Sequence, residues 1–310
     1  MEIYQGIEQV RHRLKSPAIT IGNFDGVHTG HQALFRKVKE WAQKLDGQSV
    51  VMTFHPHPLE VLFPGKPLSF ITSHEQKLDL IADFGIDATI VVPFSKDFSQ
   101  ISAREFVEDL LVGNIGVKAV VVGYDYRFGK NREGDISFLR QQGEEHDFQV
   151  DTVPGIRMDD MVVSSTAIRK MIVEGNISKA NQLLGRLFEV SGTIIPGRKR
   201  GAGLGFPTAN IRMPAQTPPR TGVYVVEAEI DGNTYGGAAN LGYNPTFGDV
   251  DLSLEVHLFD FNQDVYGKPI SVRFIDRLRD EKRFSGPQDL IDQIRKDVET
   301  ARKIYSERIA

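Results

Sequence analysis

The chain has 310 residues, which is enough for one large domain or two ordinary domains with buried cores. Its formal net charge of −4 gives no reason to expect nucleic acid or an anionic membrane as a partner. Residues 1–15 are rich in charge and no segment approaches the roughly 20 apolar residues of a membrane span, so neither a secretory signal nor a membrane anchor is expected. The sequence has no cysteine, which excludes disulfides and thiolate chemistry. We therefore expect a cytoplasmic protein.

Apolar runs alternate with helical patterns up to about residue 150. The runs that predict strands are Ala18–Ile21, Ser49–Phe54, Ala88–Val92, Ala119–Val122 and Phe148–Val153. The helices expected between them cover about 30–45, 73–84, 102–111 and 135–144. The first helix has one apolar face, formed by Leu34, Val38, Trp41 and Leu45. This alternation predicts an α/β domain with a Rossmann-like, doubly wound parallel sheet, in which ligands bind beyond the carboxyl ends of the strands.

The pattern changes after residue 186. Short runs with a period of two residues, separated by Gly- and Pro-rich turns, predict a small antiparallel β-barrel. These runs are Phe188–Ile195, Val223–Ile230, Leu252–Phe259 and Ile270–Phe274. Pro287 then precedes an amphipathic pattern that predicts a closing helix. We expect two domains, covering residues 1–186 and 187–310.

The segment Ile21–His31 joins a predicted buried strand to a predicted helix. It supplies glycines for close backbone approach, a carboxylate and two histidines at i, i+3, which suits a phosphate-binding helix start. The candidate nucleotide-binding residues are Gly22, Phe24, Asp25, Gly26 and Gly30, with His28 and His31 as candidate catalytic donors. Two alternatives remain open. The glycines could form only a tight turn, and the histidines could bind a metal, although no third ligand is evident nearby.

A second candidate phosphate-binding segment is Val163–Arg169. Ser164 or Ser165 is suited to cap the helix that follows, and Thr166 and Arg169 would add a hydroxyl and a guanidinium near the same helix end. Such a set could hold a pyrophosphate. A Ser-Ser-Thr run before a helix can equally be a cap and nothing more.

The third candidate segment, residues 197–210, combines glycines and positive charge with a Pro-Thr-Ala-Asn end. Gly201 and Gly205 would allow the backbone to approach phosphates, although no Walker A pattern is present. Thr208 and Asn210 would face the same way on an extended strand. Their neutral oxygens suit Mg²⁺, which also takes ligands from water and nucleotide phosphates.

Glu255 lies on a strand whose residues alternate between apolar and polar, and it faces the same way as His257. A carboxylate on the site side of the strand could accept the proton of a substrate hydroxyl. The alternative is an ordinary solvated strand residue.

Two of these segments resemble known signatures. Gly22–His31 together with Ser164–Arg169 resembles the paired motifs of the HxGH nucleotidyltransferases, while Thr53–Pro58 and Val122–Gly129 look like the bacterial FAD synthetase branch. The resemblance implies that the two histidines contact ATP phosphates and that Ser165, Thr166 and Arg169 close over the triphosphate. The 123–129 loop would help to shape the flavin end.

The C-terminal half resembles a riboflavin kinase module in Gly201–Asn210, Gly222–Tyr224, Asn240–Gly248 and Leu254–His257. This implies that Thr208 and Asn210 bind Mg²⁺ and nucleotide and that Glu255 is the base for the ribityl 5′-hydroxyl.

Together the resemblances cover nearly the whole chain, in the order of the bacterial bifunctional riboflavin kinase/FMN adenylyltransferases. They imply ATP, riboflavin, FMN and FAD as substrates and products, with Mg²⁺ as cofactor. Two alternatives are a nucleotidyltransferase with another phosphate acceptor and a non-catalytic flavin-binding protein on the same fold. The oligomeric state is left open by the sequence.

Overall fold

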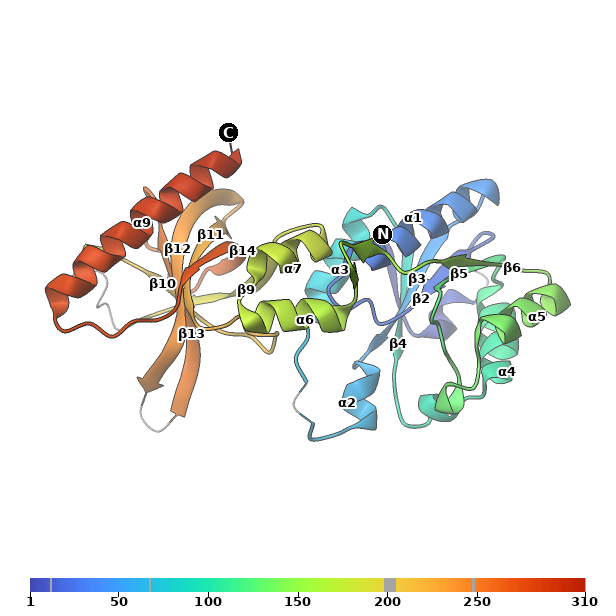
Figure 1. The fold of residues 1–310 in the computed structure, drawn as a ribbon. Helices are drawn as coiled ribbons and strands as arrows, with labels where there is room; N and C mark the ends of the chain where they lie inside the picture. The colour runs from blue at the N-terminus through green and yellow to red at the C-terminus, as the bar shows by residue number, and fades with distance from the viewer. Residues whose placement is uncertain (12, 67, 198–204, 247–248, 310) are drawn as a thin grey trace. The chain divides into compact units, whose positions relative to one another are not determined.

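The computed structural model describes residues 1–11, 13–66, 68–197, 205–246 and 249–309, and the chain divides into two compact units. The first contains Met1–Leu68 and Thr72–Ser164, and the second contains Ser69–Ile71 and Ser165–Ala310. Figure 1 shows a sheet flanked by helices in the first unit and a barrel with a long C-terminal helix in the second. No helix among the described residues has the length and apolar character needed to cross a membrane.

The first unit is built on a six-stranded sheet in the order β1-β4-β3-β2-β5-β6, and every strand pair in it is parallel. Its strands are β1 (Glu2–Gln5), β2 (Ala18–Ile21), β3 (Ser49–His55), β4 (Ala88–Pro93), β5 (Ala119–Gly123) and β6 (Gln149–Val153). Its α-helices are α1 (Thr29–Lys44), α2 (Pro58–Leu62), α3 (His74–Asp83), α4 (Ala103–Glu105) and α5 (Ile136–His146). Short 3-10 helices are η1 (Ile7–Val10), η2 (Phe98–Gln100) and η4 (Lys130–Arg132), and a two-stranded ribbon pairs β7 (Arg157–Met158) with β8 (Met161–Val162). The predicted doubly wound parallel sheet is confirmed.

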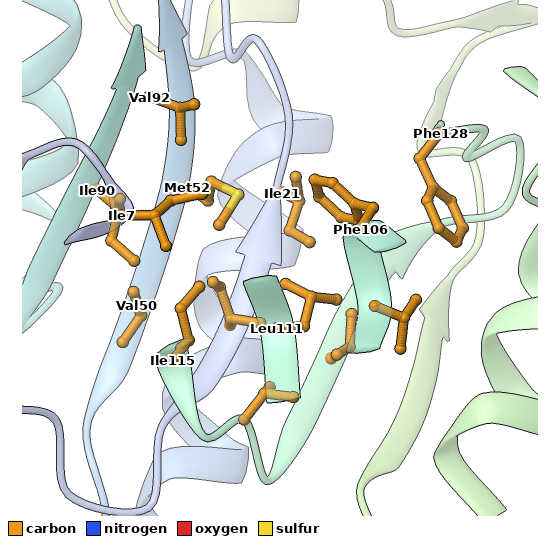
Figure 2. Close-up of a cluster of buried hydrophobic side chains, with 14 of the residues drawn as sticks. Ile7, Ile21, Val50, Met52, Ile90, Val92, Phe106, Leu111, Ile115 and Phe128 are labelled. Carbon is orange, nitrogen blue, oxygen red and sulfur yellow. The ribbon is translucent and has the colours of Figure 1, made fainter. Parts of the chain in front are cut away.

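Alternate strand residues enter two separate cores, one on each face of the sheet. On β3, Val50 and Met52 belong to a cluster with Phe106 and Leu111, whereas Val51 belongs to a cluster with the buried residues of α1. Figure 2 shows Val50 and Met52 on the same side as Phe106 and Leu111. Hydrophobic side chains therefore cover both faces of the sheet. We expect ligand-binding groups at the carboxyl ends of its strands.

The helix expected over 102–111 differs in type from the prediction. Only α4 is an α-helix, and it continues as η3, a π-helix over Phe106–Ile115 that ends at Gly116 with φ 70°. The apolar residues of this segment pack into the core whichever helix type the backbone adopts, so periodicity alone did not distinguish the two. β1 was not predicted, because three of its four residues are exposed and it lies at the edge of the sheet.

The second unit contains a closed antiparallel barrel in the order β10-β13-β12-β11-β14-β9. Its strands are β9 (Phe188–Ile195), β10 (Ala209–Arg212), β11 (Gly222–Ile230), β12 (Asn233–Thr246), β13 (Asp249–Leu258) and β14 (Pro269–Arg279). The helices of this unit are α6 (Ser165–Glu174), α7 (Ile177–Leu184) and α9 (Pro287–Ile309). Ala301 of α9 is fully buried in a small core with Val225, Ile275 and Phe259. The predicted barrel and closing helix are confirmed.

The helices α6 and α7 pack within the barrel unit. The Asn181 side chain on α7 donates to the carbonyls of Phe274 and Ile275 at 2.9 and 3.2 Å, and it accepts from the Phe188 backbone N–H at 2.7 Å. The compact units divide at Ser164, whereas the predicted domain boundary follows residue 186. That boundary remains a prediction about which fragment folds by itself.

Candidate active sites

The loop between β2 and α1 has a strained backbone. Phe24 and Val27 have φ values of 52° and 40°, and Gly26 has φ 81°. Phe24 is buried in the core on the α1 side of the sheet, and a Cβ at Gly22 would lie 3.0 Å from its ring. Non-glycine residues keep positive φ angles only where their surroundings over-determine the backbone. The surrounding structure therefore fixes the backbone conformation of this loop between β2 and α1.

The two histidines of this loop lie face to face. Their ring centroids are 3.5 Å apart at an interplanar angle of 19°, and His28 is 5% exposed. His28 is the N-cap of α1, and its Nδ1 accepts from the His31 backbone N–H at 3.3 Å. In the neutral ring this acceptance assigns the proton to Nε2, so that nitrogen is the donor of the ring. A Cβ at Gly30 would lie 3.1 Å from the His28 ring, so glycine permits this packing.

The carboxylate of Asp25 is held by Thr72, which directly precedes the N-cap residue of α3. The Thr72 backbone N–H lies 3.3 Å from Asp25 Oδ1, and the Gly26 N–H donates to Thr72 Oγ1 at 3.1 Å. Asp25 is 6% exposed. These contacts give Asp25 and Thr72 a part in shaping the loop.

The second predicted phosphate-binding segment, Val163–Arg169, lies at the start of α6. This helix begins at Ser165, which places Ser164 directly before it, and Arg169 is half-buried on the second turn. Thr166 is exposed on the first turn. Hydroxyls and a guanidinium thus occur at the N-terminal end of this helix, where the macrodipole favours an anion.

In the barrel, Asn210 and Glu255 lie side by side on one face. Strand register places Asn210 of β10 opposite Glu255 of β13, and Glu255 is in turn opposite Asn240 of β12. The Asn210 amide nitrogen lies 3.4 Å from Thr208 Oγ1. The structure therefore brings the predicted residues Thr208, Asn210 and Glu255 close together.

A cavity of about 300 Å³ adjoins this corner. Thr208 lines it together with apolar side chains of β13, Val256 and Leu258, and the aromatic residues Phe261 and Tyr266. The adjacent turn is held by His257, whose Nδ1 lies 2.9 Å from the Pro207 carbonyl. The volume of the cavity lies at the lower end of the range for small-molecule sites.

The glycine segment before this corner is only partly described. Gly201 lies outside the described residues, whereas Gly205 is described and has φ 88°. Within the described ranges, no group of three or more His, Cys, Asp and Glu side chains is arranged to hold a metal ion. Any Mg²⁺ here would instead use the neutral oxygens of Thr208 and Asn210 together with oxygens of a nucleotide and of water.

Sequence patterns did not single out Thr72, Lys77 or the contact of His257. Lys77 of α3 is only 7% exposed and lies one turn before the buried Ile81. A lysine on the apolar face of a predicted helix is unusual and could have been noticed in the sequence. The partners of all three residues come from distant parts of the chain, so the sequence could not identify them.

The first unit thus has a candidate phosphate-binding loop after β2, and the barrel brings Thr208, Asn210 and Glu255 close together. Residues 10–167 match the family described as FAD synthetase, and residues 184–305 match the family described as riboflavin kinase. The chain belongs to the family of bifunctional riboflavin kinase/FMN adenylyltransferases, which confirms the resemblance seen in the sequence.

Relatives with that description match along nearly the whole chain. The protein of Buchnera aphidicola subsp. Acyrthosiphon pisum is 36% identical over 309 residues, covering 99% of both chains. That of Escherichia coli K12 is 37% identical over 98% of both, and that of Listeria monocytogenes is 39% identical over 93% of this chain and 92% of its own. A crystal structure from Streptococcus pneumoniae, named as a macrolide-efflux protein, is 33% identical with a TM-score of 0.89 and covers 97% of this chain and 98% of that one. That likeness supports the two-unit fold.

Proposed function

We propose that the two reactions of this family are divided between the two units. The barrel transfers the γ-phosphoryl group of ATP to riboflavin, and the sheet unit transfers AMP from ATP to FMN. The observation that carries the proposal is the cross-strand pair of Asn210 and Glu255, because it places a carboxylate beside a corner of neutral oxygens.

In the kinase step, Glu255 accepts the proton of the ribityl 5′-hydroxyl as the oxygen attacks the γ-phosphorus of ATP, and ADP leaves. Thr208 and Asn210 would hold Mg²⁺, which supplies neutralisation of phosphate charge when bound. The cavity next to Thr208 would take the adenosine end of the nucleotide, because Phe261 and Tyr266 in its mixed apolar and polar lining could pack against a purine.

In the adenylyl step, a phosphate oxygen of FMN attacks the α-phosphorus of ATP and pyrophosphate leaves, so no protein nucleophile is needed. His28 would donate from Nε2 to phosphate oxygens, since its Nδ1 is engaged with the helix backbone. His31 stacks on it and would complete the pair of donors. Ser165, Thr166 and Arg169 would bind the pyrophosphate portion at the start of α6.

Product analysis tests this proposal. The protein is incubated with ATP and Mg²⁺ and with either riboflavin or FMN, and the flavins are separated by chromatography. We expect FMN and FAD from riboflavin, FAD from FMN, and no product after chelation of Mg²⁺. Riboflavin and FMN returned unchanged under all conditions would leave only the alternative of a flavin-binding protein. Adenylylation of nicotinamide mononucleotide or phosphopantetheine in preference to FMN would favour the alternative acceptor.

A further inference from the structure

Lys77 of α3 lies beneath the loop that follows β2. Its ammonium donates to the Asn23 carbonyl at 3.2 Å and to Thr53 Oγ1 at 3.1 Å, and that hydroxyl also lies 3.3 Å from the Asn23 carbonyl. The three groups form a closed triangle at the carboxyl ends of β2 and β3. Lys77 is 7% exposed and Thr53 is fully buried.

Both hydrogen-bond partners of Lys77 are neutral, and none of the ion pairs among the described residues includes it. Burial of an ammonium without a paired anion is costly, and this burial lowers the pKa of Lys77 to about 8. The nearby carboxylates of Asp25 and Glu60 favour the charged form, but they do not offset the cost of burial. An anion bound on the loop would complete the compensation.

The same segment holds the loop at a second point. Thr72 contacts Asp25 and Gly26, on the far side of Phe24 from Asn23. Phe24, between these two attachment points, has a φ of 52°. A conformation of this kind persists only where neighbouring groups impose it. Lys77 and Thr72 are those groups for this loop.

We propose that Lys77 is a positioning residue for adenylyl transfer, which fixes the loop through the Asn23 carbonyl and favours a polyphosphate on it through its buried charge. This inference rests on the proposed assignment of Gly22–His31 to the nucleotide. The proposal assigns a role to a residue outside the two motifs Gly22–His31 and Ser164–Arg169. It also predicts that adenylyl transfer depends on the protonation of one lysine.

The test compares Lys77→Met with Lys39→Met in the full chain. Lys39 is a matched control, because its ammonium also donates to a backbone carbonyl of this unit, that of Phe84 at 2.7 Å. FMN adenylylation is measured with kcat and the KM values for ATP and FMN, and riboflavin kinase activity is measured in the same preparation. We expect Lys77→Met to lower kcat/KM for ATP by about 10- to 100-fold, as a misplaced binding loop does. Kinase activity, and both activities of Lys39→Met, stay within about twofold of wild type.

The pH profile supplies a readout that a purely structural role would not change. Asp25, Glu60 and His74 interact electrostatically with Lys77, and the ring of His55 stacks on that of His74. Burial, with help from His55 and Lys77, lowers the pKa of His74 to about 4, so that ring stays neutral from pH 6 to 10. We expect wild-type adenylylation to fall as pH rises through about 8, and we expect Lys77→Met to lack this step.

Two further variants distinguish a failure of the proposal for Lys77 from a failure of the assignment of the loop to the nucleotide. Thr53→Val removes one partner of the ammonium while keeping the lysine, and we expect a smaller rise in the KM for ATP with unchanged kinase activity. Wild-type adenylylation kinetics in Lys77→Met, or equal loss of both activities in Lys77→Met and Thr53→Val, would overturn the proposal. His28→Ala is assayed in parallel. If it retains adenylylation, the assignment of the loop itself is wrong, whatever Lys77→Met does.

Discussion

Asn210 and Glu255 face each other across neighbouring strands of the barrel, at a register position where side chains of the two strands lie on the same face. Cross-strand neighbours have Cβ atoms about 5 Å apart. A metal ion held by the asparagine would therefore lie within reach of the carboxylate and of the hydroxyl that it deprotonates. The proposed roles of Asn210 and Glu255 in the kinase reaction can therefore be tested by substitution.

Glu255→Gln keeps the size and hydrogen-bonding capacity of the side chain but removes the base. We expect FMN formation from riboflavin to fall by about 10²- to 10⁴-fold, the usual contribution of general base catalysis. FAD formation from supplied FMN stays unchanged. The matched control is Glu299→Gln, a carboxamide change at an exposed position of α9. Initial rates of both reactions check this, and a Glu255→Gln protein with normal kinase activity would show that Glu255 is a solvated strand residue.

His28 has two separable roles, as the N-cap of α1 and as a phosphate donor. His28→Ala removes both, and we expect loss of FAD formation with a loss of about 1 kcal/mol in the free energy of unfolding. His28→Asn keeps a capping oxygen, so its stability stays near wild type while FAD formation is still lost. Thermal unfolding and flavin product analysis measure the two effects. Equal stability of the alanine and asparagine variants would contradict the capping role.

Gly197 leaves space for the amide of Asn210. A Cβ at residue 197 would lie 2.3 Å from the Asn210 amide nitrogen, so Gly197→Ala forces that side chain to move. We expect a lower kinase rate and a higher Mg²⁺ concentration for half-maximal activity, with normal adenylylation. Gly286→Ala is the control, since a Cβ there meets no atom within 4 Å among the described residues. A Mg²⁺ titration that is identical for both variants would argue against Asn210 as a ligand.

Lys77 also makes stability depend on pH. Burial lowers its pKa in the folded protein to about 8, whereas a lysine in the unfolded chain titrates near 10.4. Between these values the unfolded chain binds more protons, so the free energy of unfolding rises with pH over that window. Relative to Lys77→Met, we expect wild type to gain up to about 3 kcal/mol from pH 7 to 10.5. Thermal or denaturant unfolding across this range checks the sign, and a constant difference would contradict it.

The contacts of α7 predict where a kinase fragment can begin. Ile177, Ala180, Leu183 and Leu184 of α7 are fully buried, and the Asn181 side chain bonds to β14. A fragment of residues 187–310 loses this packing, at about 1.5–3 kcal/mol for each large apolar side chain. We expect a fragment of residues 165–310 to keep more kinase activity and a higher midpoint of thermal unfolding than residues 187–310. Equal stability of the two would support the boundary after residue 186.

Much of the fold could be predicted from local patterns. The bounds of β2 and β9 match the apolar runs that predicted them, and the start of α1 lies within one residue of the expected position. The strands β10 and β12 were not predicted, because β10 is short without the continuous apolar run that marks β2, and β12 is rich in glycine and asparagine. Their pairing depends on the neighbouring strands of the closed barrel, which a single segment does not reveal.

The sequence by itself determined the kinds of element, their order and the residue types that can handle phosphates and protons, because hydrophobic periodicity, glycine and proline act over a few residues. Only the tertiary structure decided which groups meet. Lys77 and Asn23 are 54 residues apart in the chain, and Asn210 and Glu255 are neighbours only through the register of β10 and β13. Contacts of this kind follow from strand register and from burial, which are properties of the whole fold.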